Sequence, residues 1–161
     1  MTIRYLARAL FALLVTTAFG CGGGGGGGST APVNPTKATL TLSIPSLPAN
    51  TLVSSAIFTI KLPQGVSPAV LSGTDAWGSV TLTGGAVGSL SIANFSSSQI
   101  TFGSVTLNGF GPGNFMIVNC VISSGTTVTA SDFSLSNIQV YDSPSATLIP
   151  TATISMAVQL S

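Results

Sequence analysis

Few residues of this chain could act as acids, bases or nucleophiles. Histidine and glutamate are absent, the acidic residues are Asp75, Asp132 and Asp142, and the two cysteines are Cys21 and Cys120. Catalytic sites usually combine histidine, carboxylates or a thiol held beside a base. Because these groups are almost all missing, we expect no enzymatic activity. An enzyme would need a site made of three aspartates and hydroxyls alone.

The three aspartates could instead hold Ca²⁺, which prefers oxygen ligands, but their spacing matches no dedicated calcium loop. Asp132 follows Ser131 just before a strand pattern, and Asp142 lies in the sequence Asp-Ser-Pro-Ser. Aspartates in such positions commonly form turns in which the side chain bonds nearby backbone amides. We therefore expect turn-forming aspartates, with no metal site and no cofactor.

The amino terminus has the layout of a secretory signal peptide. Residues 1–8 are short and basic, with Arg4 and Arg8, and residues 9–19 form an apolar run of 11 residues broken only by Thr16 and Thr17. A membrane-spanning helix needs roughly 20 apolar residues, so this run is too short to be one. Residues 1–20 are therefore predicted to be a cleaved signal peptide.

The apolar run ends in Ala18-Phe19-Gly20-Cys21, which resembles the bacterial lipobox, a small residue before a cysteine that receives diacylglycerol. The resemblance implies a lipoprotein anchored to the membrane through Cys21. Lipoboxes usually have leucine and a small residue where this chain has Ala18 and Phe19, so a freely secreted protein is the alternative. In having a glycine, Gly22, rather than an aspartate directly after the cysteine, the chain resembles lipoproteins that are sent to the outer membrane. The location this implies is the cell envelope, at the outer membrane or cell surface.

Residues 21–36 are predicted to be a flexible tether between this anchor and a folded domain. Seven consecutive glycines occupy residues 22–28, and Ser-Thr-Ala-Pro-Val-Asn-Pro-Thr follows at residues 29–36. The segment offers little apolar surface to bury and would lose much entropy on ordering. A phosphate-binding loop is disfavoured because no strand precedes the glycines and no Gly-Lys-Ser/Thr follows them.

The fate of Cys21 decides that of Cys120. If the sulfur of Cys21 carries lipid, Cys120 has no intramolecular partner; otherwise a Cys21–Cys120 disulfide is the competing interpretation. Cys120 lies within an apolar run, where a free cysteine commonly behaves as a small buried hydrophobe.

The charge balance excludes nucleic acid as a partner. The whole chain has a net charge of +1, and without residues 1–20 two lysines and three aspartates remain, so that 2 − 3 = −1. Two lysines cannot form the basic surface that phosphates require. With 45% apolar residues and many threonines and valines, the chain is typical of β-sheet rather than of disorder.

Apolar and polar residues alternate from residue 37 onward, which is the pattern of half-buried strands. Residues 39–44 place Leu40, Leu42 and Ile44 on one face, and in residues 55–62 one face holds Ala56, Phe58, Ile60 and Leu62. Further strands are predicted at residues 79–82, 87–95, 99–107, 114–122, 133–141 and 151–160, and Ile138 and Val140 continue the alternation. Residues 114–122 are apolar on almost both faces, which favours a central strand.

About eight or nine such strands without a helical pattern predict an all-β fold, a single β-sandwich of jelly-roll type over residues 37–161. A closed barrel is the weaker alternative because strands and loops are uneven in length.

Three segments carry a resemblance to cohesin modules. They are Ile-Lys-Leu-Pro-Gln-Gly-Val at residues 60–66, Gly-Phe-Gly-Pro-Gly-Asn-Phe-Met-Ile-Val at 109–118, and Ala-Ser-Asp-Phe-Ser-Leu-Ser-Asn-Ile-Gln-Val-Tyr-Asp at 130–142. In turn placement and strand pattern they are similar to cohesins and to related carbohydrate-binding sandwiches. The resemblance implies a nine-stranded jelly roll that binds either a dockerin-like protein or a polysaccharide, without catalysis.

Trp77 and Tyr141 are the aromatic residues singled out as candidates for ligand binding. Trp77 lies in a loop sequence, Gly-Thr-Asp-Ala-Trp-Gly, where it could stack on a sugar ring or anchor the loop against the sandwich. Tyr141 has the same two interpretations.

Two functions from different classes are consistent with these patterns. The first is a lipid-anchored, non-catalytic binding module outside the cytoplasm, for a protein or a polysaccharide. The alternative is a structural or assembly component of the cell envelope or of a surface appendage, because an uncharged surface resists association with neighbours less than a charged one does.

Overall fold

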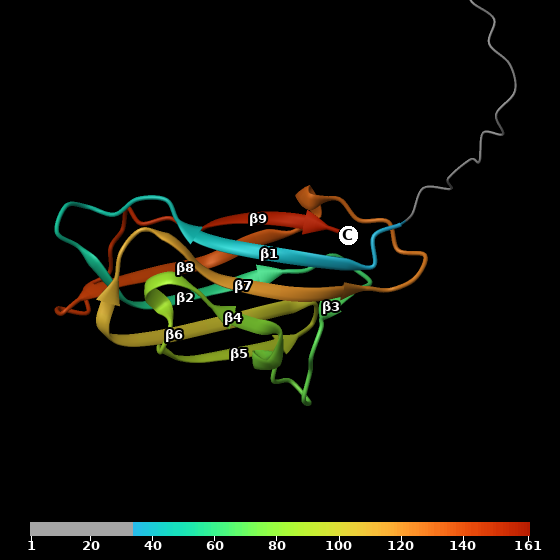
Figure 1. Ribbon diagram of the computed structural model, residues 1–161, viewed down its shortest axis with the longest axis horizontal. Coiled ribbons are helices and arrows are strands. Elements are labelled where there is room, and N and C mark those ends of the chain that lie inside the picture. Colours follow the sequence, from blue (N-terminus) through green and yellow to red (C-terminus); the bar gives the residue numbers. More distant parts are fainter. Residues whose placement is uncertain (1–33) are drawn as a thin grey trace, which may run out of the picture. The chain divides into compact units, whose positions relative to one another are not determined.

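Alternating side chains build nine strands in the computed structural model, which describes residues 34–161 (Figure 1). The signal segment, Cys21 and most of the predicted tether lie outside the described residues. The strands are β1 (Lys37–Ile44), β2 (Leu52–Lys61), β3 (Val66–Pro68), β4 (Val80–Leu82), β5 (Leu90–Ser96), β6 (Gln99–Phe110), β7 (Gly113–Ile122), β8 (Ser134–Ser143) and β9 (Ser155–Leu160).

Three 3₁₀ turns of three residues each complete the regular structure: η1 (Trp77–Ser79), η2 (Gly84–Ala86) and η3 (Ala130–Asp132). Within residues 34–161 we find no helix of the length and apolarity needed to cross a membrane.

The strands form two antiparallel sheets. In the first, β9, β1 and β7 are neighbours, and both β3 and β4 pair with the far side of β7. In the second, the order is β5-β6-β2-β8. The predicted all-β sandwich is confirmed, and residues 114–122 form the central strand β7 as predicted.

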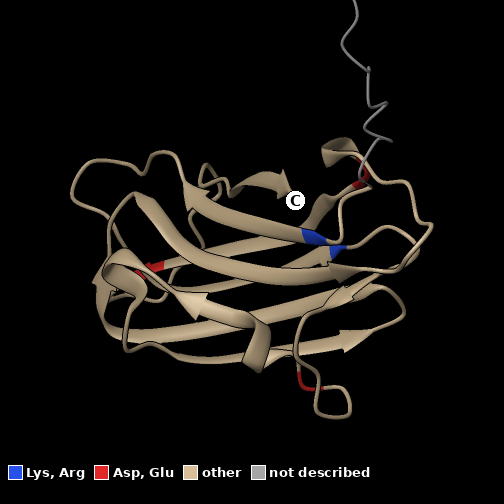
Figure 2. Cartoon of the chain, turned by 45° about the vertical axis from the view of Figure 1, so that its right-hand side comes forward, with Lys and Arg blue, Asp and Glu red and all other residues tan. Residues whose placement is uncertain are grey.

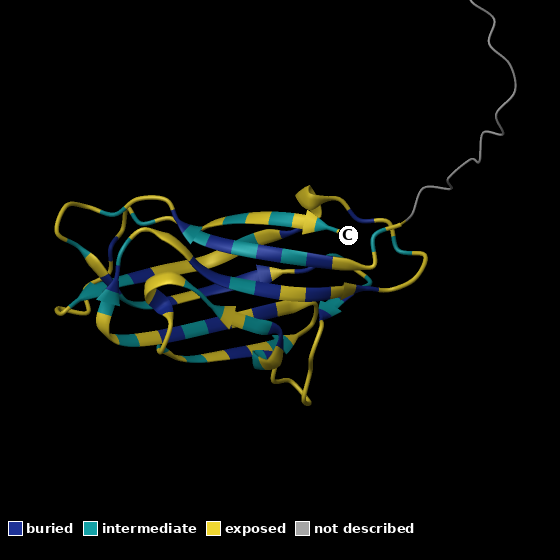
Figure 3. Ribbon diagram, viewed as in Figure 1, coloured by how far each residue is buried: buried dark blue, intermediate teal, exposed yellow. Residues whose placement is uncertain are grey.

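The core lies between the sheets and is built from the side chains that point inward. Figure 3 shows the buried positions alternating with more exposed ones along the strands. Phe58 of β2 is the centre of the core: its ring lies 5.0 Å from that of Phe102 in the same sheet and 6.0 Å, edge to face, from that of Phe115 in the other. The inward residues predicted from β1 and β2 are all buried. Because the core residues run from Ala38 to Ile154, the unit Val33–Ser161 has a core of its own, as an independently folding domain requires.

The structure differs from the predicted strands in several places. Strand β9 begins at Ser155 rather than at residue 151, because a turn precedes it, in which Ala152 N–H donates to Ile149 O at 3.1 Å. Strand β3 was not predicted, because a strand of three residues that ends in Pro68 gives too short a pattern. Strand β5 begins at Leu90 rather than at residue 87, because η2 and Gly88, with φ 85°, form a turn there. Ile138 does not continue the alternation with the buried Val140 and is 36% exposed, because the register of β8 shifts at Asn137, whose φ is 53°.

The two ends of the sandwich are distinct, and we call them the entry end and the distal end. The entry end is where the chain begins β1, with Thr36 and Lys37 bonded to Ser161. The distal end is where β1 leads into β2, at residues 44–52. Since β2 starts at the distal end, the antiparallel pairing puts the start of β5 and the end of β8 there too.

Neighbouring residues of β2 allow a direct test of this packing. We predict that Phe58→Ala lowers the free energy of unfolding by about 3–5 kcal/mol, because it opens a cavity in the core. Ile57→Ala should cost less than about 1.5 kcal/mol, because Ile57 is 40% exposed on the outer face. Urea unfolding of residues 29–161 measures both. Equal losses would contradict the assigned faces.

Candidate interaction face

The outer face of the second sheet is organised in four rows that cross β5, β6, β2 and β8 in that order. Their members follow from the register, since residues paired across antiparallel strands point to the same side. The two rows nearer the distal end are Leu90–Val105–Ser55–Tyr141 and Ile92–Gly103–Ile57–Gln139. The two nearer the entry end are Asn94–Thr101–Thr59–Ser136 and Ser96–Gln99–Lys61–Ser134.

The two distal rows, which we call the apolar half, leave large aliphatic side chains in contact with solvent. Leu90 is 82% exposed, Ile92 63%, Val105 54% and Ile57 40%. The two rows contain no charged residue, whereas the entry-end rows are polar and include Lys61. Clustered aliphatic exposure of this kind marks an interaction surface more often than scattered exposed leucines do.

A shallow depression of about 380 Å³ lies within the apolar half, lined by Ser55, Ile57, Leu90, Ser91, Ile92, Gly103, Ser104 and Val105. Gly103 creates it, because this position of the row has no side chain between Ile92 and Ile57. A Cβ atom at Gly103 would lie 3.5 Å from Ile92 Cγ1, an ordinary van der Waals contact. A side chain added there would therefore fill the depression and leave the core undisturbed.

Leu107 adds a fully solvated side chain beyond the apolar half. Val105 and Phe110 lie five positions apart in β6 but pair with Ser55 and Val53, which lie only two positions apart in β2. Strand β6 therefore bulges away from β2 between these residues. Leu107 lies in this bulge and is 95% exposed. Leu107 thus extends the exposed aliphatic surface of this face.

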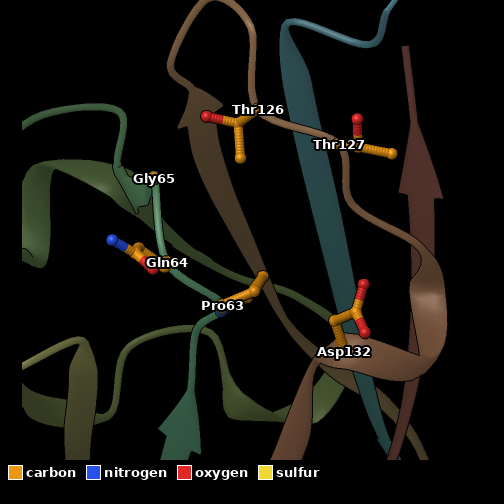
Figure 4. Close-up of a pocket in the computed structure, with 6 residues that line it drawn as sticks. All are labelled: Pro63, Gln64, Gly65, Thr126, Thr127 and Asp132. Atoms are coloured by element: carbon orange, nitrogen blue, oxygen red, sulfur yellow. The ribbon is translucent and has the colours of Figure 1, made fainter.

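A second hollow, at the entry end, is polar and open (Figure 4). It measures about 590 Å³ and is lined by Pro63, Gln64, Gly65, Thr126, Thr127 and Asp132. Asp132 is its only charged lining residue, and its Oδ2 already accepts hydrogen bonds from the backbone N–H and the hydroxyl of Thr129. The hollow brings together no nucleophile and base, and no second carboxylate.

No family model and no curated protein matches this sequence. Among solved structures, the domain is similar to a non-cellulosomal cohesin from the hyperthermophilic archaeon Archaeoglobus fulgidus, with a TM-score of 0.53. The sequences are 17% identical, and the match covers 72% of this chain and 74% of that chain. The domain has a cohesin-like fold. The predicted cohesin-like jelly roll is thereby confirmed, while a shared fold by itself leaves the ligand open.

The aspartates of the cohesin-like domain lie in three separate places (Figure 2): Asp75 in a loop, Asp132 in η3 and Asp142 near the end of β8. Asp75 Oδ1 accepts a hydrogen bond from the backbone N–H of Trp77 at 2.8 Å. Thr129 lowers the pKa of Asp132 by its backbone and hydroxyl hydrogen bonds, and Ser145 and Thr147 lower the pKa of Asp142 in the same way. The predicted role in turns is confirmed. In residues 34–161, no three His, Cys, Asp or Glu residues gather as metal ligands.

Trp77 and Tyr141 lie at opposite edges of the cohesin-like domain's second sheet. Trp77 follows the loop beside β5, and its half-buried ring stacks on the core residue Phe102 at 6.4 Å. Tyr141 lies on β8 in the outermost distal row, and its hydroxyl donates to Gln139 Oε1 at 3.1 Å. The structure does not bring the two rings together, and a ligand contact by either remains a prediction.

Cys120 points into the core from β7 and is 2% exposed. Burial raises the pKa of its thiol to about 12, so the nucleophilic thiolate is scarce at neutral pH.

The residues of the apolar half were not predicted as a site. The run Ala56-Ile57-Phe58, which breaks the alternation by placing apolar residues on both faces, was the signal available in the sequence.

Proposed function

We propose that residues 37–161 form a non-catalytic module that binds a protein partner through the apolar half of the β5-β6-β2-β8 face. The observation that carries this proposal is the grouping of Leu90, Ile92, Val105 and Ile57 around one depression on an uncharged surface. Fully burying one such side chain contributes about 1.5–3 kcal/mol. Four of them together could supply several kcal/mol toward association.

The composition of the apolar half favours a protein over a polysaccharide. Sugar-binding faces typically present several coplanar aromatic rings, and this face offers Tyr141 alone. Trp77, the other candidate, packs its ring against the core. Aliphatic side chains around a hollow suit apolar side chains of a protein surface, which fill such a space closely. We expect an uncharged partner surface and an affinity that changes little with salt.

We further propose that the module is lipid-anchored outside the cytoplasm through Cys21. The burial of Cys120 supports this, because a disulfide to Cys21 would have to enter the core. The course of the chain is also compatible with such an anchor. The chain begins β1 at Lys37, at the entry end, whereas the apolar half lies toward the distal end. Attachment through the residues before Lys37 would leave the binding rows at the far end of the domain.

The binding face is tested by two substitutions on the same strand and the same face. Gly103→Arg fills the depression, whereas Thr101→Arg places the same side chain in the adjacent polar row. We predict that wild type and Thr101→Arg, immobilised as residues 29–161, retain the same protein from a native envelope extract. Gly103→Arg should retain at least about tenfold less, with an unchanged unfolding midpoint in urea.

Equal retention by all three proteins would contradict the proposed face. A wild-type domain that retains no protein would count against a protein partner. Binding of an insoluble glycan that Tyr141→Ala abolishes would favour the polysaccharide alternative.

The anchor is tested separately in cells. We predict that the full chain incorporates radioactive palmitate and fractionates with membranes. Cys21→Ala should abolish the labelling, because the acyl groups are carried by the sulfur of Cys21 and by the amino group that cleavage before Cys21 exposes. Cys120→Ala, the matched control, should label like wild type. An unlabelled wild-type chain, or equal labelling of Cys21→Ala, would refute the anchor.

A further inference from the structure

Strand β9 leaves a regular set of backbone groups without partners along one edge of the sandwich. At its end, Lys37 N–H donates to Ser161 O at 2.8 Å and Ser161 N–H donates to Lys37 O at 3.0 Å. In an antiparallel pair, such bonded residues alternate with non-bonded ones. Ala157 and Gln159 therefore bond to β1, while the N–H and C=O groups of Met156, Val158 and Leu160 point away from it.

These groups form an open edge in the described part of the chain. Strand β9 is the last strand of its sheet, and no loop of residues 34–161 makes a backbone hydrogen bond to Met156, Val158 or Leu160. Exposed edges are normally protected by a charge, a proline or a bulge. Ser-Met-Ala-Val-Gln-Leu contains no charged residue and no proline, and its register with β1 is regular.

The order of apolar and polar residues along β9 is symmetric about Val158. Half-buried apolar residues, Met156 and Leu160, stand two positions on either side. The exposed residues Ala157 and Gln159 stand one position away, and serines stand three positions away at 155 and 161. A strand with this symmetry can pair with an identical antiparallel strand so that like environments meet on both faces.

We propose that β9 pairs antiparallel with β9 of a second copy of this chain, about a two-fold axis through Val158. Val158 would then bond to Val158 of the second copy, and Met156 to its Leu160, each pair exchanging both backbone hydrogen bonds. Ala157 would face Gln159 of the second copy in a non-bonded pair, where side chains approach most closely. The two copies of β9 would join their sheets into one continuous sheet.

Charge does not oppose this pairing. The described chain has only five charged side chains, Lys37, Lys61, Asp75, Asp132 and Asp142, and none lies on β9. The half-buried side chains of Met156, Val158 and Leu160 already pack against the core and would be covered further by the second copy. Closed two-fold pairing also satisfies the edge without propagating into a fibre.

This arrangement goes beyond the proposed binding of one partner, because it makes the module bivalent. A two-fold axis perpendicular to the sheets turns the two β5-β6-β2-β8 faces toward the same side. A partner with two binding segments, or an array of partners, would then be held with a higher effective concentration. The two chains would begin β1, at Lys37 of each copy, at opposite ends of the dimer, since the paired strands are antiparallel.

A pair of charge variants on the exposed face of β9 tests the register. In A157K/Q159K, lysine faces lysine across the axis; in A157E/Q159K, glutamate faces lysine. We predict by sedimentation equilibrium of residues 29–161 that wild type dimerises, and that A157K/Q159K raises the dimer dissociation constant at least tenfold. A157E/Q159K should stay within about threefold of wild type in low salt and weaken as salt is added. Gly103→Arg, on the proposed binding face, should dimerise like wild type.

Amide hydrogen exchange on the same samples checks the edge itself. In dilute wild type, the amides of Ala157 and Gln159 should exchange slowly and those of Met156, Val158 and Leu160 quickly. At high concentration the second group should slow at least tenfold, and A157K/Q159K should prevent this. A wild type that is monomeric at 1 mM would overturn the proposal. So would a dimer that both charge variants leave unchanged, or one that Gly103→Arg disrupts.

Discussion

Inward packing of alternate side chains between two sheets is the interaction on which the rest of this structure depends. Phe58 is central to it, since its ring contacts Phe102 within its own sheet and Phe115 across the interface. Burial of these rings sets which residues of β2, β6 and β7 face inward between the register shifts, because the side-chain period of a strand is two. Whatever the domain presents to a partner is therefore what remains on the two outer faces and the open edges.

The two outer faces differ, and the difference carries the functional argument. On the first sheet, β1 presents the polar residues Thr39, Thr41 and Ser43 outward, as a solvated sheet face normally does. The outward apolar residues of β7, Ile117 and Val121, are separated by Asn119 and pair with Thr41 and Lys37. On the second sheet, Ile57, Ile92 and Val105 occupy equivalent positions. With so few charges and no histidine, the domain has little means of recognition other than apolar area, hydroxyls and backbone edges. The cohesin-like fold provides a sheet face large enough to use them.

Much of the fold could be predicted from the sequence, because alternation is a local property. The inward residues of β1 and β2 followed directly from Leu40, Leu42, Phe58 and Ile60, and the turns from proline, glycine and aspartate. Strand β3 was missed because its three residues are held by pairing with β7, which is distant in sequence. Ile138 was expected to continue the alternation with Val140, because a bulge at Asn137 leaves no mark on the pattern.

The candidate face could not be predicted in the same way. Leu90, Val105 and Ile57 each looked like an ordinary strand residue, and only the register of β5, β6 and β2 brings them around Gly103. Register over such separations depends on the tertiary packing of the sandwich rather than on any one segment. Trp77 illustrates the opposite case, since its sequence context allowed either a ligand contact or a loop anchor, and its ring stacks on the core residue Phe102.

Methyl NMR of the domain, titrated with the protein that it retains, tests the central claim most directly. Binding through the apolar half predicts shifts or broadening for the methyl groups of Leu90, Ile92, Val105 and Ile57. The methyl groups of Ile117 and Val121, on the outer face of the other sheet, should stay unchanged. Perturbation of Ile117 and Val121 with unaltered signals from Ile57 and Ile92 would contradict the account.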